Sequence, residues 1–283
     1  MTAKELITAL EAGARSNYRD RYRQGNIIHL TGPGDVIMTG DLHGNEQNFD
    51  KLVRVAQLAD NPNRHLILHE LLHSGNSPIP DQCHSYRLVS MVARLKEQFP
   101  HQVHCLMGNH AMAQITRGEI VKNGQAVVAA LNAGLYATYG QNTQHVMQAL
   151  DRFLMSLPLA ARTDNRIWLS HSLPSLRNLV KFDYDIFEKK ITLDTLENNS
   201  SLRALIWDRV HSSKCLAELQ VMWNIDMFII GHQPQSQGFG RPLKNLFILA
   251  SDHSKGYYLP FELGKTYTPD DLGCLARPLA AIA

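Results

Sequence analysis

The 283-residue sequence is poor in cysteine, and its cysteines have no spacing typical of a cross-link or a zinc knuckle. Four are present, and they lie far apart without any C-x-x-C pair: Cys83, Cys105, Cys215 and Cys274. This scarcity argues against both a disulfide scaffold and a cysteine zinc finger. Such isolated cysteines suit a reducing compartment.

The sequence also lacks an excess of charge of one sign and a long apolar run. Its 28 Lys plus Arg nearly balance 26 Asp plus Glu, which excludes a disordered polyelectrolyte and gives no reason to expect nucleic acid as a partner. No apolar run approaches the roughly 18 to 20 residues that cross a bilayer, and residues 1–13 do not resemble a signal peptide. We therefore expect a cytoplasmic protein with no membrane partner.

Histidine, in contrast, is abundant. The chain has 14 His against 9 Tyr and 9 Phe, and imidazole is the commonest metal ligand in proteins. With 44% hydrophobic residues and no clear linker, the chain is expected to form a single domain over residues 1–283. Residues 124–157 have a largely helical pattern and are interpreted as a cap or insertion within it.

Short apolar runs alternate with stretches of helical period along most of the chain. This alternation predicts an α/β layered fold. The strands are expected over six ranges, 35–39, 65–68, 103–107, 167–169, 227–230 and 246–250.

Four of these runs lead into a His accompanied by Asp, Asn, Gly or Ser. The motifs are Gly40-Asp41-Leu42-His43-Gly44, Gly108-Asn109-His110, Ser170-His171-Ser172 and Gly231-His232-Gln233-Pro234. One such His alone is more often an ordinary polar residue. Ligand crevices of open α/β sheets, however, lie outside the carboxyl ends of the strands, so the four motifs are expected to meet. Oxygen donors mixed with imidazoles suit a dinuclear site for Mn, Fe or Zn.

In their order and placement, these motifs resemble those of the calcineurin-like metallophosphoesterase superfamily, most nearly the Ser/Thr phosphoprotein phosphatases. The resemblance spans residues 40–234 and implies two mixed β-sheets packed as a sandwich and flanked by helices. It further implies a first metal held by Asp41 and His43 and a second held by three residues. Those three ligands are Asn109, His171 and His232, and the general acid implied is His110.

The activity implied by this resemblance is hydrolysis of a phosphate monoester, with two divalent cations activating a hydroxide. Paired cations lower the pKa of a bridging water and neutralise the phosphoryl oxygens of an in-line displacement. The partner implied is a phosphorylated substrate, either a phosphoprotein or a small phosphoester.

The second motif of the family, G-D-x-x-D-R-G, is altered in this chain. The corresponding segment is His69-Glu70-Leu71-Leu72-His73-Ser74-Gly75, and its alignment on Gly75 gives Glu70 the metal-bridging position. His73 then replaces the Asp that orients the acid, and Ser74 replaces a phosphate-binding Arg. Without its Asp, His110 is expected to lose a fixed tautomer, at a cost of roughly 10- to 100-fold.

Arg209, in Ile206-Trp207-Asp208-Arg209, lies where relatives carry a Trp-containing segment near a phosphate-binding Arg. We take it as a candidate phosphate-binding residue. A structural ion pair with Asp208 or another acid is the alternative.

Two other functions compete with the phosphatase hypothesis. The segment His69-Glu70-Leu71-Leu72-His73 matches H-E-x-x-H, the zinc-peptidase pattern, which requires a helix. The altered second motif also permits a metallophosphoesterase fold kept as a binding module with weakened catalysis.

Overall fold

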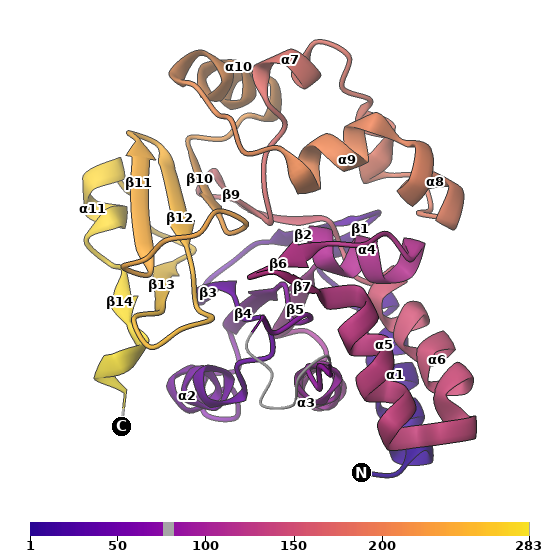
Figure 1. The fold of residues 1–283 in the computed structure, drawn as a ribbon. Coiled ribbons are helices and arrows are strands. Elements are labelled where there is room, and N and C mark those ends of the chain that lie inside the picture. Colours follow the sequence, from indigo (N-terminus) through magenta and orange to yellow (C-terminus); the bar gives the residue numbers. More distant parts are fainter. Residues whose placement is uncertain (76–81, 283) are drawn as a thin grey trace.

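The computed structural model describes residues 1–75 and 82–282. Two sheets form its centre (Figure 1). The first contains, in spatial order, β1 (Arg23–Gln24), β2 (Ile27–Leu30), β8 (Ala160–Thr163), β9 (Ile167–Ser170), β10 (Met227–Ile230), β12 (Leu246–Leu249) and β11 (Phe239–Leu243). The second contains β14 (Arg277–Pro278), β13 (Tyr257–Glu262), β3 (Asp35–Asp41), β4 (Arg64–His69) and β5 (Val103–Leu106). A separate hairpin pairs β6 (Val121–Lys122) with β7 (Gln125–Ala126).

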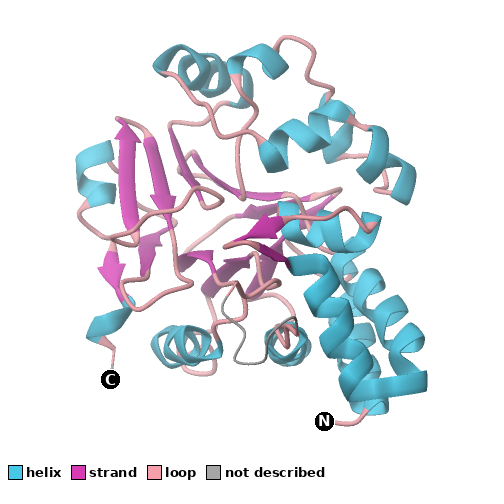
Figure 2. Ribbon diagram, in the orientation of Figure 1, coloured by secondary structure: helices cyan, strands magenta, loops and turns pink. Residues whose placement is uncertain are grey.

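Helices lie on the outer sides of the two sheets (Figure 2). Beside the smaller sheet lie α2 (Glu46–Ala56) and α3 (Tyr86–Gln98), and beyond the larger sheet lie α7 (Leu176–Leu179), α8 (Leu193–Asn198), α9 (Ser200–Trp207) and α10 (Ser213–Trp223). The remaining helices are α1 (Ala3–Tyr18), α4 (Asn109–Thr116), α5 (Val127–Tyr139), α6 (Thr143–Met155) and α11 (Pro269–Gly273). This arrangement confirms the predicted fold class, α/β with two mixed sheets flanked by helices. Within the described residues, no helix is both long and apolar enough to cross a membrane.

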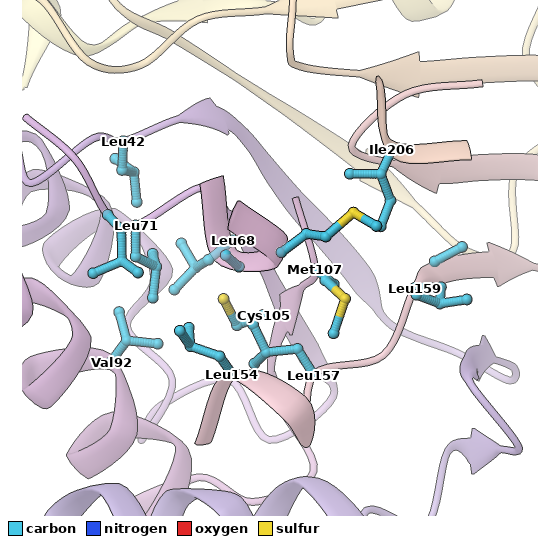
Figure 3. Close-up of a cluster of buried hydrophobic side chains, with 14 of the residues drawn as sticks. Leu42, Leu68, Leu71, Val92, Cys105, Met107, Leu154, Leu157, Leu159 and Ile206 are labelled. Atoms are coloured by element: carbon cyan, nitrogen blue, oxygen red, sulfur yellow. The ribbon is translucent and has the colours of Figure 1, made fainter. Parts of the chain in front are cut away.

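The core has two parts because successive strand residues point to opposite faces of a sheet. On β3, Val36 and Met38 belong to the apolar layer between the sheets, whereas Ile37 belongs to the cluster beneath the outer helices. The strand β10 divides in the same way at Ile229 and Phe228. Figure 3 shows part of the outer cluster, where side chains from β4 and β5 meet those of α6 and its following loop.

All six predicted strands are present, with ends that differ by at most two residues. The segment 124–157 is helical as expected, and it contains α5 and α6. Helix α6 packs against α1 and α4. The interpretation of residues 124–157 as a cap or insertion stays a prediction.

Candidate metal centre

The carboxyl ends of the parallel strands of both sheets meet at one edge of the molecule. In the smaller sheet β3, β4 and β5 are parallel, and in the larger sheet β9, β10 and β12 are parallel. An isolated parallel bridge between Asp41 and Ala250 joins the two sheets at this edge. A cleft of about 820 Å³ opens there, and its lining includes six of the candidate residues. These six are Asp41, His43, Asn109, His110, Arg209 and His232.

Four side chains, three from loops and one from the first residue of α4, converge on one point beneath this cleft. His171 Nε2 lies 2.8 Å from Asn109 Oδ1, 2.9 Å from His232 Nδ1 and 3.2 Å from Glu70 Oε2. His232 Nδ1 lies 3.1 Å from Asn109 Oδ1, and each of the four residues is at most 4% exposed. Neighbouring ligands at about 2.1 Å from one cation lie about 3 Å apart in octahedral and about 3.4 Å apart in tetrahedral coordination. The spacing therefore suits the ligands of a single cation.

Asp41 and His43 lie next to this cluster, with 3.5 Å between Asp41 Oδ2 and His43 Nε2. The Nδ1 of His43 lies 2.8 Å from the Leu72 carbonyl oxygen, which accepts its proton and leaves the Nε2 lone pair facing Asp41. The other carboxylate oxygen of Asp41 accepts a 3.0 Å hydrogen bond from the backbone N–H of His232. Asp41 thus contacts both His43 and His232, which belong to the two groups of candidate ligands.

The protonation of the two imidazoles in the buried cluster, His171 and His232, fits a divalent cation. Burial lowers the pKa of His232 to about 4, and burial also holds the pKa of His171 well below its usual value. Burial raises the pKa of Glu70 to about 7, and its Oε1 atom is buried with no hydrogen-bond partner among the described residues. Neutral imidazoles beside an orphaned carboxylate oxygen present lone pairs with few protons between them. This is what a metal site requires.

The backbone around the ligands is locally unusual. His43, Glu70 and His232 have φ values of 42°, 50° and 65°, in the left-handed region that non-glycine residues rarely adopt. Such conformations cluster at functional sites, where the surrounding structure holds them. Gly108 is required for a related reason, because a Cβ at this position would lie 2.3 Å from Glu70 Oε2. The glycine leaves room for a carboxylate one methylene longer than Asp.

His69, whose predicted role lay only in the competing zinc-peptidase pattern, lies beside the candidate ligands. Its Nδ1 lies 3.2 Å from His171 Nδ1 and 3.3 Å from Asp41 Oδ1, and its Nε2 lies 2.9 Å from the Thr39 carbonyl oxygen. Asp41, His69 and His171 also have the spacing of a potential metal-binding group. The Thr39 carbonyl, however, keeps the proton of His69 on Nε2, so Nδ1 accepts the Nδ1–H of His171. His171 then directs its Nε2 lone pair at Asn109. We therefore regard His69 as an orienting residue.

The expectation that His110 lacks a partner is wrong. His110 Nδ1 lies 3.0 Å from His73 Nδ1, and His73 Nε2 lies 2.9 Å from Gln114 Oε1. Because an amide oxygen only accepts, His73 carries its proton on Nε2 and accepts the Nδ1–H of His110. The replacement of Asp by His therefore retains an acceptor at Nδ1, although it removes the negative charge.

Arg209 lies in the cleft and donates from Nε to His232 Nε2 at 2.9 Å. Its predicted alternative, an ion pair with Asp208, is absent among the described residues. Asp208 instead accepts hydrogen bonds from the Ser175 backbone and the Asn178 side chain, both at 2.7 Å.

The structure contradicts the zinc-peptidase hypothesis. β4 ends at His69, and no helix follows through residue 75, the last residue described before the gap. Glu70 and His73 both have positive φ, which an α-helix excludes. The two His of the pattern contact different groups, Thr39 and Gln114, rather than facing one cation.

The family model for calcineurin-like phosphoesterases matches residues 35–236. The chain therefore belongs to the calcineurin-like phosphoesterase family, whose members use divalent metal ions. A curated relative, a probable serine/threonine-protein phosphatase of Encephalitozoon cuniculi (strain GB-M1), is 22% identical over 183 residues. The match covers 64% of this chain and 35% of that protein, so the chain spans about a third of the length of this relative.

Solved structures share the fold at low sequence identity. A protein serine/threonine phosphatase from Saccharomyces cerevisiae, with similarity to human phosphatase PP5, has a TM-score of 0.65 at 13% identity, covering 92% of this chain and 82% of its own. A cold-active protein-tyrosine phosphatase from a Shewanella species has a TM-score of 0.55 at 13% identity, with 84% and 78% covered.

Proposed function

We propose that this protein is a metal-dependent phosphoesterase that hydrolyses phosphate monoesters. A protein carrying phosphoserine or phosphothreonine, or a small phosphoester, is the proposed substrate. The observation that supports this function best is the buried cluster of Glu70, Asn109, His171 and His232 beside Asp41 at the base of an open cleft. A cytoplasmic location and the lack of nucleic-acid and membrane partners stay predictions.

In this proposal the ligands hold two divalent cations, of Mn, Fe or Zn. Asp41 and His43 would hold the first, Asn109, His171 and His232 the second, and Glu70 would bridge them. When bound, such a pair lowers the pKa of a shared water and neutralises charge on the phosphoryl oxygens.

The tautomer of His232 determines whether the guanidinium of Arg209 is available to bind the substrate. His232 Nε2 lies 2.9 Å from Arg209 Nε and 3.1 Å from the Trp207 carbonyl oxygen. Without a proton, Nε2 accepts a hydrogen bond from Arg209; with a proton, it donates one to Trp207. With the Nδ1 lone pair used as a ligand, the proton of His232 lies on Nε2 and is donated to Trp207. The guanidinium of Arg209 is then released from His232 and can donate to phosphoryl oxygens in the cleft.

His110 supplies the proton for the leaving alkoxide. Its Nδ1–H is fixed by His73, so its Nε2 is the nitrogen that takes up and delivers a proton. Burial, together with the neighbouring His43 and His73, holds the pKa of His110 well below its usual value. At neutral pH little of His110 is therefore protonated in the metal-free protein, and an acidic leaving group depends least on receiving its proton.

The test is hydrolysis of p-nitrophenyl phosphate and phenyl phosphate by purified protein supplied with Mn²⁺. We expect turnover that Asp41→Ala abolishes and that His110→Ala lowers by about 100-fold on phenyl phosphate, with a smaller loss on p-nitrophenyl phosphate. His145→Ala, which removes an exposed histidine on α6, serves as the matched control. Metal binding without turnover would contradict the proposed activity and favour a binding module.

A further inference from the structure

The hairpin β6–β7 places a lysine at the cleft. Asn123 and Gly124 form its turn with φ values of 52° and 77°, the pattern of a tight two-residue hairpin. Lys122 is the last residue of β6 and lies in the cleft lining together with His43 and Asn109.

The position of Lys122 relates to the altered second motif. Ser74 carries no charge where the family motif has a phosphate-binding Arg. The alkyl part of Lys122 passes beside this segment, because a Cβ at Gly75 would lie 3.3 Å from both Lys122 Cγ and Cδ. The hairpin therefore brings a lysine from elsewhere in the sequence alongside the segment in which the motif lacks its arginine.

Lys122 is one of only two Lys or Arg residues among the described residues that line the cleft, the other being Arg209. An anion in the cleft is therefore within the reach of two cationic side chains on separate elements.

The ammonium group has a weak partner in this state. Lys122 Nζ lies 3.3 Å from Asp252 Oδ2, and the two side chains are 26% and 27% exposed. Partly exposed lysine–carboxylate pairs contribute little to stability, so an incoming anion with two or more charged oxygens can replace Asp252 as the partner.

We infer that Lys122 binds the phosphoryl group of the substrate in place of the missing motif arginine, exchanging its contact with Asp252 for one with phosphate. This inference rests on the proposed function, since it assigns a binding residue to the same cleft. It makes Lys122 a substrate-binding residue and Asp252 a competitor of the substrate.

The experiment measures binding of inorganic phosphate to the Mn²⁺-loaded protein by calorimetry, together with KM and kcat for phenyl phosphate. For Lys122→Met we expect about tenfold weaker phosphate binding and a matching rise in KM, with a smaller change in kcat. Lys122→Arg should restore binding. Lys4→Met, an exposed lysine on α1, is the control and should match the wild type.

Asp252→Asn should change the affinity for phosphate in the opposite direction. It should tighten phosphate binding several-fold in the wild-type background, and by much less when combined with Lys122→Met, because the competition acts through Lys122.

The outcomes separate this inference from the proposed function. If the wild type binds phosphate and hydrolyses phenyl phosphate while Lys122→Met does both equally well, the inference on Lys122 is wrong and the proposed function stands. Equal tightening by Asp252→Asn with and without Lys122 would also overturn the inference. If the metal-loaded wild type neither binds phosphate nor hydrolyses the ester, the proposed function itself fails.

Discussion

The Nδ1 atoms of His73 and His110 lie 3.0 Å apart, a distance at which the two rings share one proton. Gln114 decides which ring donates, because its Oε1 accepts from His73 Nε2 at 2.9 Å. Gln114 is itself held by a 2.9 Å hydrogen bond from its Nε2 to Asn132 Oδ1. A neutral chain of side chains thus replaces the carboxylate that orients the acid in the family motif.

Loss of Gln114 should impair turnover without loss of metal. In Gln114→Leu, His73 is free to adopt the other tautomer, and His110 then loses its acceptor for part of the time. We expect kcat for phenyl phosphate to fall by roughly tenfold, in the range typical of lost orienting partners. Gln114→Glu retains an acceptor and is the matched variant. A kcat unchanged in Gln114→Leu would show that the chain does not orient His110.

Loss of His69 should weaken metal binding. His69→Ala removes the acceptor for His171 Nδ1–H, so the ligand nitrogen of His171 is no longer held as a lone pair. We expect Mn²⁺ affinity, measured by competition with a chromophoric chelator, to fall by about tenfold. His145→Ala controls for histidine content alone. If His69→Ala and His145→Ala bind Mn²⁺ as tightly as the wild type does, then His69 has no orienting role.

Glu70 should destabilise the folded protein when metal is absent and stabilise it when metal is bound. Burial raises its pKa to about 7, so in the metal-free protein near neutral pH its ionisation is disfavoured by the fold. We expect Glu70→Gln to raise the Tm of the metal-free protein by a few degrees and to reduce the additional stabilisation by Mn²⁺. Differential scanning calorimetry with and without Mn²⁺ measures both effects. A lower Tm without metal, or an undiminished Mn²⁺ effect, would contradict this assignment.

A second buried polar cluster lies on β4 and β5, away from the strand ends that form the cleft. Asp20 Oδ2 lies 2.5 Å from Lys96 Nζ and 2.9 Å from His104 Nδ1. His104 Nε2 lies 3.1 Å from His65 Nδ1. Burial, followed by the effect of His104, lowers the pKa of His65 to about 3. The other groups that act on His65 are Asp20, Arg21 and His101.

This cluster predicts a loss of stability in mild acid. An unfolded His takes up a proton near pH 6.5, whereas folded His65 does so only near pH 3. Between these values the unfolded chain binds more protons, so the free energy of unfolding falls as the pH decreases. Asp20 adds to this loss only in stronger acid: His104 and Lys96 outweigh its burial and lower its pKa, so below about pH 4 the unfolded chain again binds the extra proton.

The measurement is urea unfolding of metal-free protein from pH 4.5 to 7.5. We expect His65→Asn to reduce the slope of unfolding free energy against pH by up to about 1.4 kcal/mol per pH unit. His145→Ala, which removes an exposed histidine on α6, is the control for histidine content. Parallel slopes for the wild type and His65→Asn would contradict the assigned titration.

The sequence was sufficient to predict the strands and the candidate ligands they present. The apolar runs that lead to Asp41, Asn109, His171 and His232 form β3, β5, β9 and β10. The parallel arrangement then brings these residues together, because the carboxyl ends of such strands share an edge.

The supporting residues were harder to predict, each for a physical reason. His69 is the last residue of β4, and its predicted role lay only in the competing zinc-peptidase pattern. Gln114 lies one helical turn after His110 on α4, a spacing that places both on one helix face. Lys122 reaches the cleft through the Asn123-Gly124 turn, a hairpin signal that the helical pattern after it obscured.

The most direct test of the account is anomalous diffraction from a crystal of the protein loaded with Mn²⁺. We expect two anomalous peaks about 3.5 to 4 Å apart, with the Glu70 carboxylate between them. One peak, or two peaks with Glu70 bound to neither, would contradict the proposed dinuclear centre.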